Sequence, residues 1–100
     1  MGWYILTTIT ISNLMKIVDE INLIDIRSSS RFNNNHIPGA KNIEYGTLLA
    51  EPSKYLDRHK KYYFYCQRGM QSHKLCAYLS SIGYDVVNVA GGYEAWILEK

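Results

Sequence analysis

The stretch FYCQRGMQSHK combines residue types that could carry out nucleophilic chemistry at one cysteine. Cys66 ends a run of aromatic residues and precedes a loop, Gln67–Gln71, that leads into a helical pattern from Ser72. A loop that curls ahead of a helix can turn several backbone N–H groups toward one point, and the helix N-terminus adds positive potential there. Gly69 can adopt the positive φ of such a curl, and Arg68 adds a full positive charge. These features favour a nucleophilic thiolate beside a site for an oxyanion or a persulfide anion.

A cysteine at the end of a strand can also be a packed core residue, because free cysteine is among the most buried residue types. The strand, the glycine-containing loop and the helix together favour the reactive interpretation for Cys66. Cys76 keeps the packed interpretation, because it shares a helical face with Leu75, Leu79 and Ile82. The spacing alone leaves a Cys66–Cys76 disulfide open, but only two cysteines favour a reduced, intracellular protein over a secreted disulfide scaffold.

Other catalytic chemistries have weaker support in the sequence. Cys66, His73 and Cys76 form C-x6-H-x2-C, which is not a common zinc spacing, and His36 and His59 are not paired with further ligands. The chain contains neither the G-x-S-x-G motif of serine hydrolases nor the phosphate-binding G-x-x-x-x-G-K-[ST] motif. We therefore expect no metal and no cofactor.

The elements that position Cys66 can be predicted from hydrophobic periodicity. Alternation over Ile5–Ile11 predicts a first strand, and Ser12 or Asn13 is a plausible N-cap for the helix that follows. The nearly continuous apolar run Ile21–Arg27 is typical of a strand buried on both faces of a parallel sheet. The polar segment Ser28–Asn35 predicts a loop with room for one helical turn.

The second half of the chain continues this alternation. The patterns predict a strand at Lys41–Ile43, short helical pieces broken at Pro52, a strand at Tyr62–Cys66, a helix from Ser72 to a C-cap at Gly83, a strand in DVVNVA and, after Gly91-Gly92, a final helix over Tyr93–Lys100. Strands that alternate with helices predict an α/β fold: a mostly parallel central sheet with helices on both faces, in one domain over residues 1–100.

Composition limits the partners that we expect. The chain has 100 residues and a formal net charge of +2, which gives no strong electrostatic case for binding nucleic acid or a membrane surface. Its first residues, MGWYILTTITI, lack the basic region and small-residue cleavage site of a signal peptide and are too short to span a bilayer. We expect a cytoplasmic protein that is a monomer.

Four segments, in order, resemble the single-domain rhodanese (thiosulfate sulfurtransferase-like) family. The segments are LIDIR, HIPGAKNI, YFYCQRGMQS and GYDVVNVAGGYEAW. They are similar to the family's Asp-x-Arg strand end, its His-Ile-Pro-Gly-Ala signature, its active-site strand and loop, and its closing Gly-Gly turn and Ala-Trp helix. The resemblance implies a rhodanese-like three-layer domain and a sulfurtransferase that moves a sulfane sulfur from thiosulfate or a persulfide to a thiol, a protein or cyanide.

Carried over by position, the resemblance gives Cys66 the role of nucleophile and persulfide carrier. It makes the loop and the start of the helix the substrate-binding residues, with Arg68 as the anion contact. These residues are Gln67, Arg68, Gly69, Met70, Gln71 and Ser72. His36 in the family signature is expected to be structural, and Asp25 and Arg27 are expected to join loops through a charge pair.

Two features bear on which substrate is used. The six-residue loop from Cys66 to Gln71 resembles sulfur-handling members, whereas related phosphatases and arsenate reductases have a longer loop and a closing arginine. Many members place arginine where this chain has Gln71, so Arg68 is the only cation of the loop and the donor could be a persulfide rather than thiosulfate. Two alternatives stay open: a sulfur-relay or binding module that is active only with a protein partner, and, with less support, a small phosphatase or arsenate reductase.

Overall fold

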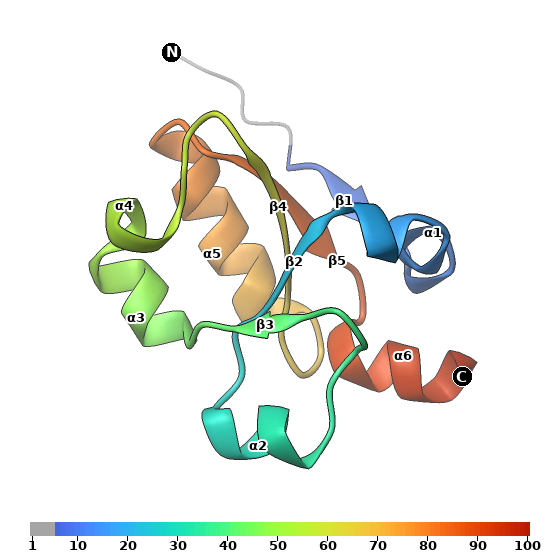
Figure 1. Ribbon diagram of the computed structural model, residues 1–100. Coiled ribbons are helices and arrows are strands. Elements are labelled where there is room, and N and C mark those ends of the chain that lie inside the picture. The colour runs from blue at the N-terminus through green and yellow to red at the C-terminus, as the bar shows by residue number, and fades with distance from the viewer. Residues whose placement is uncertain (1–5) are drawn as a thin grey trace.

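The computed structural model describes residues 6–100, which form a five-stranded sheet between helices (Figure 1). The strands lie in the order β1-β5-β4-β2-β3, and each recorded strand pair is parallel. Their bounds are β1 Thr8–Ile9, β2 Asn22–Asp25, β3 Lys41–Asn42, β4 Lys61–Tyr65 and β5 Asp85–Val89. This confirms the predicted α/β fold with a parallel central sheet.

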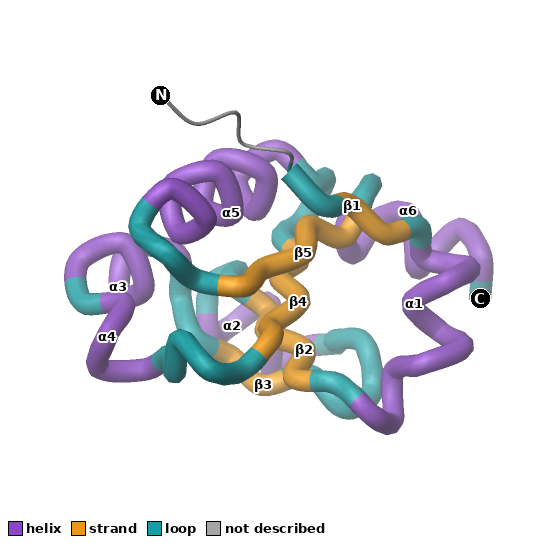
Figure 2. The backbone as a smooth tube through the Cα atoms, turned by 90° about the horizontal axis from the view of Figure 1, so that it is seen from above, coloured by secondary structure: helices purple, strands orange, loops and turns teal. Residues whose placement is uncertain are grey.

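Helices cover both faces of the sheet, as predicted (Figure 2). Their bounds are α1 Ile11–Ile17, α2 Ser29–Asn34, α3 Tyr45–Ala50, α4 Pro52–Tyr55, α5 Met70–Ser81 and α6 Gly92–Glu99, with a short 3₁₀ helix, η1, at Val18–Glu20. Helices α3, α4 and α5 lie on one side of the strands and α1 and α6 on the other, while α2 lies beyond the carboxyl ends of the strands (Figures 1 and 2).

The central strand β4 explains why the fold has two hydrophobic cores. Tyr62 and Phe64 pack in the cluster that contains Leu75 of α5, whereas Tyr63 and Tyr65 pack in the opposite cluster with residues of α1 and α6. Successive side chains of a strand point to opposite faces, so an uninterrupted aromatic run serves both cores at once. The same geometry brings the carboxyl end of β4, and therefore Cys66, to the edge where the loops after β2 and β5 also emerge.

Several local predictions were wrong in their boundaries. The first helix begins at Ile11 rather than after Ser12 or Asn13, because Thr10 is the N-cap and its Oγ1 accepts from the N–H of Asn13 at 3.2 Å. The predicted strand over Ile5–Ile11 is therefore limited to Thr8–Ile9 among the described residues, and Ile5 lies outside them.

The polar segment after β2 forms a helix, α2, instead of a loop with one turn. Ser28 caps it by accepting from the N–H of Arg31 at 3.3 Å, which is a local side-chain signal that favours helix over loop. Helix α5 begins at Met70, two residues before the predicted start at Ser72. Gly69, at φ +98°, turns the chain directly into the helix and shortens the loop.

Nothing within residues 6–100 is a helix long and apolar enough to cross a bilayer. The expectation about a signal peptide depends on the first residues, and Met1–Ile5 lie outside the described part of the chain.

Candidate active site

Cys66 follows β4 directly, and its sulfur lies in a cradle of backbone N–H groups. The N–H of Gly69 donates to Sγ at 3.1 Å, and the N–H of Ser72 donates at 3.3 Å. Ser72 lies in the first turn of α5, so the sulfur also faces the positive end of a 12-residue helix. Two N–H donors and a helix N-terminus stabilise negative charge on sulfur, which is the property that a thiolate or persulfide anion requires.

Glycines keep the cradle tight. Gly69 has φ +98°, and a Cβ there would lie 3.0 Å from the backbone nitrogen of Gly91 in the turn after β5. The loop after β4 and the turn after β5 therefore touch through their backbones, which larger residues would push apart.

The Ser72 hydroxyl links the sulfur to a buried amide. Ser72 Oγ lies 2.6 Å from Oδ1 of Asn88 and 3.4 Å from Cys66 Sγ, and both Ser72 and Asn88 are buried. The hydroxyl has one hydrogen, so with Cys66 protonated it donates to Asn88 and accepts from the thiol. Once the thiol has lost its proton, rotation of the hydroxyl lets it donate to the sulfur instead. Asn88 was not predicted, although it is the one polar residue within the otherwise apolar run VVNVA.

Replacing Ser72 with alanine is expected to slow alkylation of Cys66 by iodoacetamide about tenfold, the equivalent of one lost hydrogen bond to a charged sulfur. It should also lower the free energy of unfolding by about 1–3 kcal/mol, because Asn88 Oδ1 is left buried without its donor. Ser81→Ala is the control, since Ser81 Oγ donates to the carbonyl of Tyr78 at an exposed position. An unchanged alkylation rate in Ser72→Ala would show that the backbone N–H groups alone support the thiolate.

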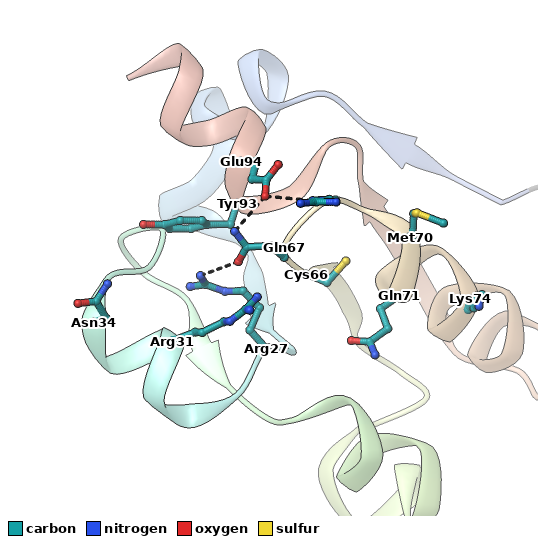
Figure 3. A pocket seen from close by; sticks show the side chains of 11 residues that line it. Arg27, Arg31, Asn34, Cys66, Gln67, Met70, Gln71, Lys74, Tyr93 and Glu94 are labelled. Atoms are coloured by element: carbon teal, nitrogen blue, oxygen red, sulfur yellow. Dashed lines mark hydrogen bonds and ion pairs between the residues drawn. The ribbon is translucent and has the colours of Figure 1, made fainter.

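A pocket of about 580 Å³ opens over Cys66 (Figure 3). The active-site loop and the start of α5 contribute part of its wall, through Gln67, Arg68, Met70 and Gln71. The remaining wall comes from other parts of the chain, through Arg27, Arg31, Asn34, Lys74, Tyr93 and Glu94. Met70 is 71% exposed at the rim. Of the predicted substrate-binding residues, Gly69 and Ser72 contribute to the cradle rather than to this wall.

Arg27 forms the buried floor between α2 and the active-site loop. Its Nη2 donates to Asp25 Oδ2 at 2.7 Å and to the carbonyl of Asn35 at 2.7 Å, and its Nη1 donates to Gln67 Oε1 at 3.3 Å. The guanidinium also lies over the ring of Tyr93, 4.0 Å from its centroid. This confirms the expected charge pair that joins loops. The charge of Arg27 is balanced by Asp25, so Arg27 orients Gln67 more than it attracts anions.

Arg68, the predicted anion contact, forms an ion pair with Glu94 at the pocket mouth. Its side chain is 75% exposed, and Nε donates to Glu94 Oε2 at 3.2 Å. Gln67 Nε2 donates to the same oxygen at 3.3 Å. Hydrogen bonds from Gln67 and Arg68 lower the pKa of Glu94, so its carboxylate is charged at neutral pH.

Helix α6 is fastened to the active-site loop through its backbone. The N–H of Tyr93 donates to the carbonyl of Cys66 at 2.9 Å, and the N–H of Glu94 donates to the carbonyl of Gln67 at 3.0 Å. These contacts satisfy two N–H groups that a helix N-terminus would otherwise leave without a partner. They also fix the loop from the side opposite to α5.

Cys76 and His36, the other candidate residues, do not line this pocket. Cys76 is fully buried in the core with Leu75 and Leu79; burial, with a smaller contribution from neighbouring Cys66, raises the pKa of its thiol to about 12. Both cysteines are free thiols. His36 stacks on the ring of Phe32 at 3.8 Å and its Nδ1 lies 2.8 Å from the carbonyl of Phe32, which agrees with the expected structural role. Within residues 6–100, no three His, Cys, Asp or Glu side chains lie close enough to hold a metal ion.

Comparison with known proteins identifies the family. The family model of the rhodanese-like domain matches residues 10–99. YtwF of Bacillus subtilis, whose name places it among sulfurtransferases, is 35% identical over 91 residues, which cover 91% of this chain and 87% of YtwF. Thiosulfate sulfurtransferase GlpE of Shewanella oneidensis is 34% identical over 77 residues, covering 76% of this chain and 75% of GlpE.

A solved structure is similar over the same extent. The rhodanese-like domain protein of Staphylococcus aureus superposes with a TM-score of 0.82 at 30% identity, over 91% of each chain. The match of the family model over nearly the whole described fold, together with these relatives, shows that this chain belongs to the rhodanese-like domain family and is a sulfurtransferase-type protein.

Proposed function

We propose that this rhodanese-like protein transfers a sulfane sulfur through a persulfide on Cys66. The Cys66 thiolate attacks the outer sulfur of the donor, a new S–S bond forms, and the donor's own S–S bond breaks. From thiosulfate the leaving group is sulfite, and from a persulfide it is a thiolate; each departs with the bonding electron pair. An acceptor thiolate or cyanide then attacks the outer sulfur of the Cys66 persulfide and restores the Cys66 thiolate.

The observation that carries this proposal is the pair of N–H contacts on Cys66 Sγ, from Gly69 and Ser72. The negative charge lies on Sγ before the attack and, after it, on the outer sulfur of the persulfide, one S–S bond away. Donors beside Sγ therefore favour the thiolate that attacks and lie near the charge that the persulfide carries. The pocket over Cys66 provides space for the transferred sulfur and for an incoming acceptor. The relatives named as sulfurtransferases support the same reaction class.

The pocket also bears on the alternative functions. A phosphatase or arsenate reductase needs a cradle of N–H groups for a tetrahedral oxyanion. Here the loop is short, and the N–H groups of Gly69 and Ser72 donate to the Cys66 sulfur itself. Both features argue against that alternative. A sulfur relay that needs a docked partner would use the same Cys66 persulfide, so it differs from the enzyme in its acceptor and not in its chemistry. We propose a small anionic donor and a thiol or protein acceptor.

The test is the intact mass of the reduced protein after brief treatment with thiosulfate or with a persulfide donor. We expect a gain of one sulfur atom, located by digestion on the peptide that holds Cys66 and removed by cyanide. A gain located on Cys76 would contradict the proposal, as would the absence of any gain with both donors. Transfer to free thiols by the loaded protein supports the enzyme, whereas transfer only to an added protein partner supports the relay.

A further inference from the structure

One ion pair at the pocket mouth joins the active-site loop to α6. Arg68 and Glu94 both line the pocket over Cys66, and Nε of Arg68 lies 3.2 Å from Oε2 of Glu94. An exposed ion pair contributes little to stability, because water screens it. Its position nevertheless matters, because Arg68 is the only cation of the loop that follows Cys66.

The Glu94 carboxylate has two hydrogen-bond donors on the active-site loop, and its backbone is bonded to the same loop. Its own backbone N–H donates to the carbonyl of Gln67, and its Oε2 accepts from Gln67 Nε2 at 3.3 Å as well as from Arg68. Gln67 is in turn oriented by the buried Arg27, through the 3.3 Å contact to Oε1. A chain of contacts from the interior therefore presents a negative charge to Arg68 at the entrance.

We propose that Glu94 is a specificity-determining residue that selects among sulfur donors by neutralising Arg68. A compact dianion such as thiosulfate must compete with Glu94 for the guanidinium and also meets the carboxylate's negative charge. A persulfide with a single negative charge loses less from both effects. Arg31 and Lys74 also line the pocket and attract either anion, so the effect of Glu94 is to lower the preference for thiosulfate relative to a persulfide. This inference rests on the proposed function, since it names the donor class of the same site.

The short distances between charges at the pocket mouth support an effect of Glu94 on anion binding. Charges at one pocket mouth lie within the Debye length of about 8–10 Å at physiological salt, so their interaction with an entering anion is only partly screened. Mutating one charge at the rim of a binding site typically changes the association rate of charged ligands and its dependence on salt. The effect should therefore appear in KM for anionic donors and decrease as salt is added.

The first experiment compares the Glu94→Gln variant with the unmodified protein. Glutamine keeps the shape of the side chain and an oxygen that can accept from Arg68, but it removes the charge. We expect KM for thiosulfate to fall about fivefold, equivalent to roughly 1 kcal/mol, with a much smaller change in kcat. KM for a singly charged persulfide should change less than twofold. The control is Glu51→Gln, which removes the same charge from an exposed residue outside this pocket and should leave both KM values unaltered.

A merely structural role of Glu94 predicts a different pattern. If the carboxylate only held the loop, Glu94→Gln would lower kcat for both donors and would not reduce KM for thiosulfate. That pattern, or an unchanged KM for thiosulfate, would overturn the inference.

The second experiment does not depend on turnover. Cys66 is alkylated with iodoacetate, which is an anion, and with iodoacetamide, which is neutral but otherwise similar. We expect Glu94→Gln to raise the iodoacetate-to-iodoacetamide rate ratio several-fold, and to raise it much less in an Arg68→Gln background. An equal rise in both backgrounds would overturn the role assigned to Arg68.

The two experiments separate the inference from the function on which it rests. If Cys66 accepts no sulfur from either donor but the alkylation ratio shifts as expected, the proposed function fails while the charge selection at the pocket stands. If sulfur transfer occurs and neither the ratio nor KM changes, the function stands and the selection by Glu94 is rejected.

Discussion

Replacing Cys66 with serine is expected to abolish sulfur transfer while the fold persists. Serine can still accept the N–H groups of Gly69 and Ser72, so the cradle keeps its partners. Its hydroxyl, however, is a weak nucleophile at neutral pH and cannot form a persulfide. We expect the rate to fall by at least about a thousandfold, to the level without enzyme. The measurement is thiocyanate formation from a sulfur donor and cyanide, with circular dichroism to confirm folding.

Cys76→Ala is the matched control for that substitution. Cys76 is buried, and its thiol is neutral far above physiological pH because burial raises its pKa to about 12. We expect nearly unchanged activity per folded molecule and a loss of about 1–2 kcal/mol in the free energy of unfolding, from the small cavity left in the core. Equal losses of activity in the two variants would show that the roles of the cysteines are assigned wrongly.

Gly92→Ala is expected to be severely destabilising and to disrupt the active site. Gly92 has φ +57°, and a Cβ there would lie 3.1 Å from the carbonyl carbons of both Cys66 and Gln67 and would overlap the carbonyl oxygen of Cys66. The neighbouring atoms are backbone and cannot rotate away, so either α6 or the active-site loop must shift. We expect the free energy of unfolding to fall by about 3–5 kcal/mol, because alanine is strained at a positive φ and its Cβ overpacks the loop.

The measurement is urea unfolding together with the rate of Cys66 alkylation in the folded state. Gly46→Ala is the control, because Gly46 lies in α3 with open space around its Cβ position and no positive φ. Alanine there should stabilise the protein by about 0.5–1 kcal/mol and leave the alkylation rate unchanged. A Gly92→Ala variant as stable as the parent would mean that α6 and the loop can separate without cost.

The features of the active site that are local in sequence were the predictable ones. The Cys66 cradle depends on a strand, a glycine and a helix within a few residues, and each has its own pattern. The alternation of strands and helices likewise predicted a parallel sheet. Boundaries were less predictable where two patterns overlapped, as at Ile11, which continues the alternation of the first strand and also begins the helical spacing with Leu14.

The far wall of the pocket could not be predicted in this way. Arg31, Tyr93 and Glu94 line the same pocket as Cys66 because β2 and β5 flank β4 in the sheet, so that the segments after all three strands emerge at one edge. Strand order is a property of the whole fold and leaves no pattern in a short segment. The pairing of Arg68 with Glu94 follows from that order, so the pattern around Cys66 alone could not predict it.

The attachment of α6 to the active-site loop also determines how the site responds to thermal fluctuations. The amides of Tyr93 and Glu94 donate to the carbonyls of Cys66 and Gln67, so unwinding the first turn of α6 would remove support from the residue that carries the sulfur. We therefore expect loop and helix to open together as one cooperative unit, with Cys66 reactive toward sulfur donors only while that unit is closed. Mutations in α6 that touch no substrate can then change activity through the population of the closed state.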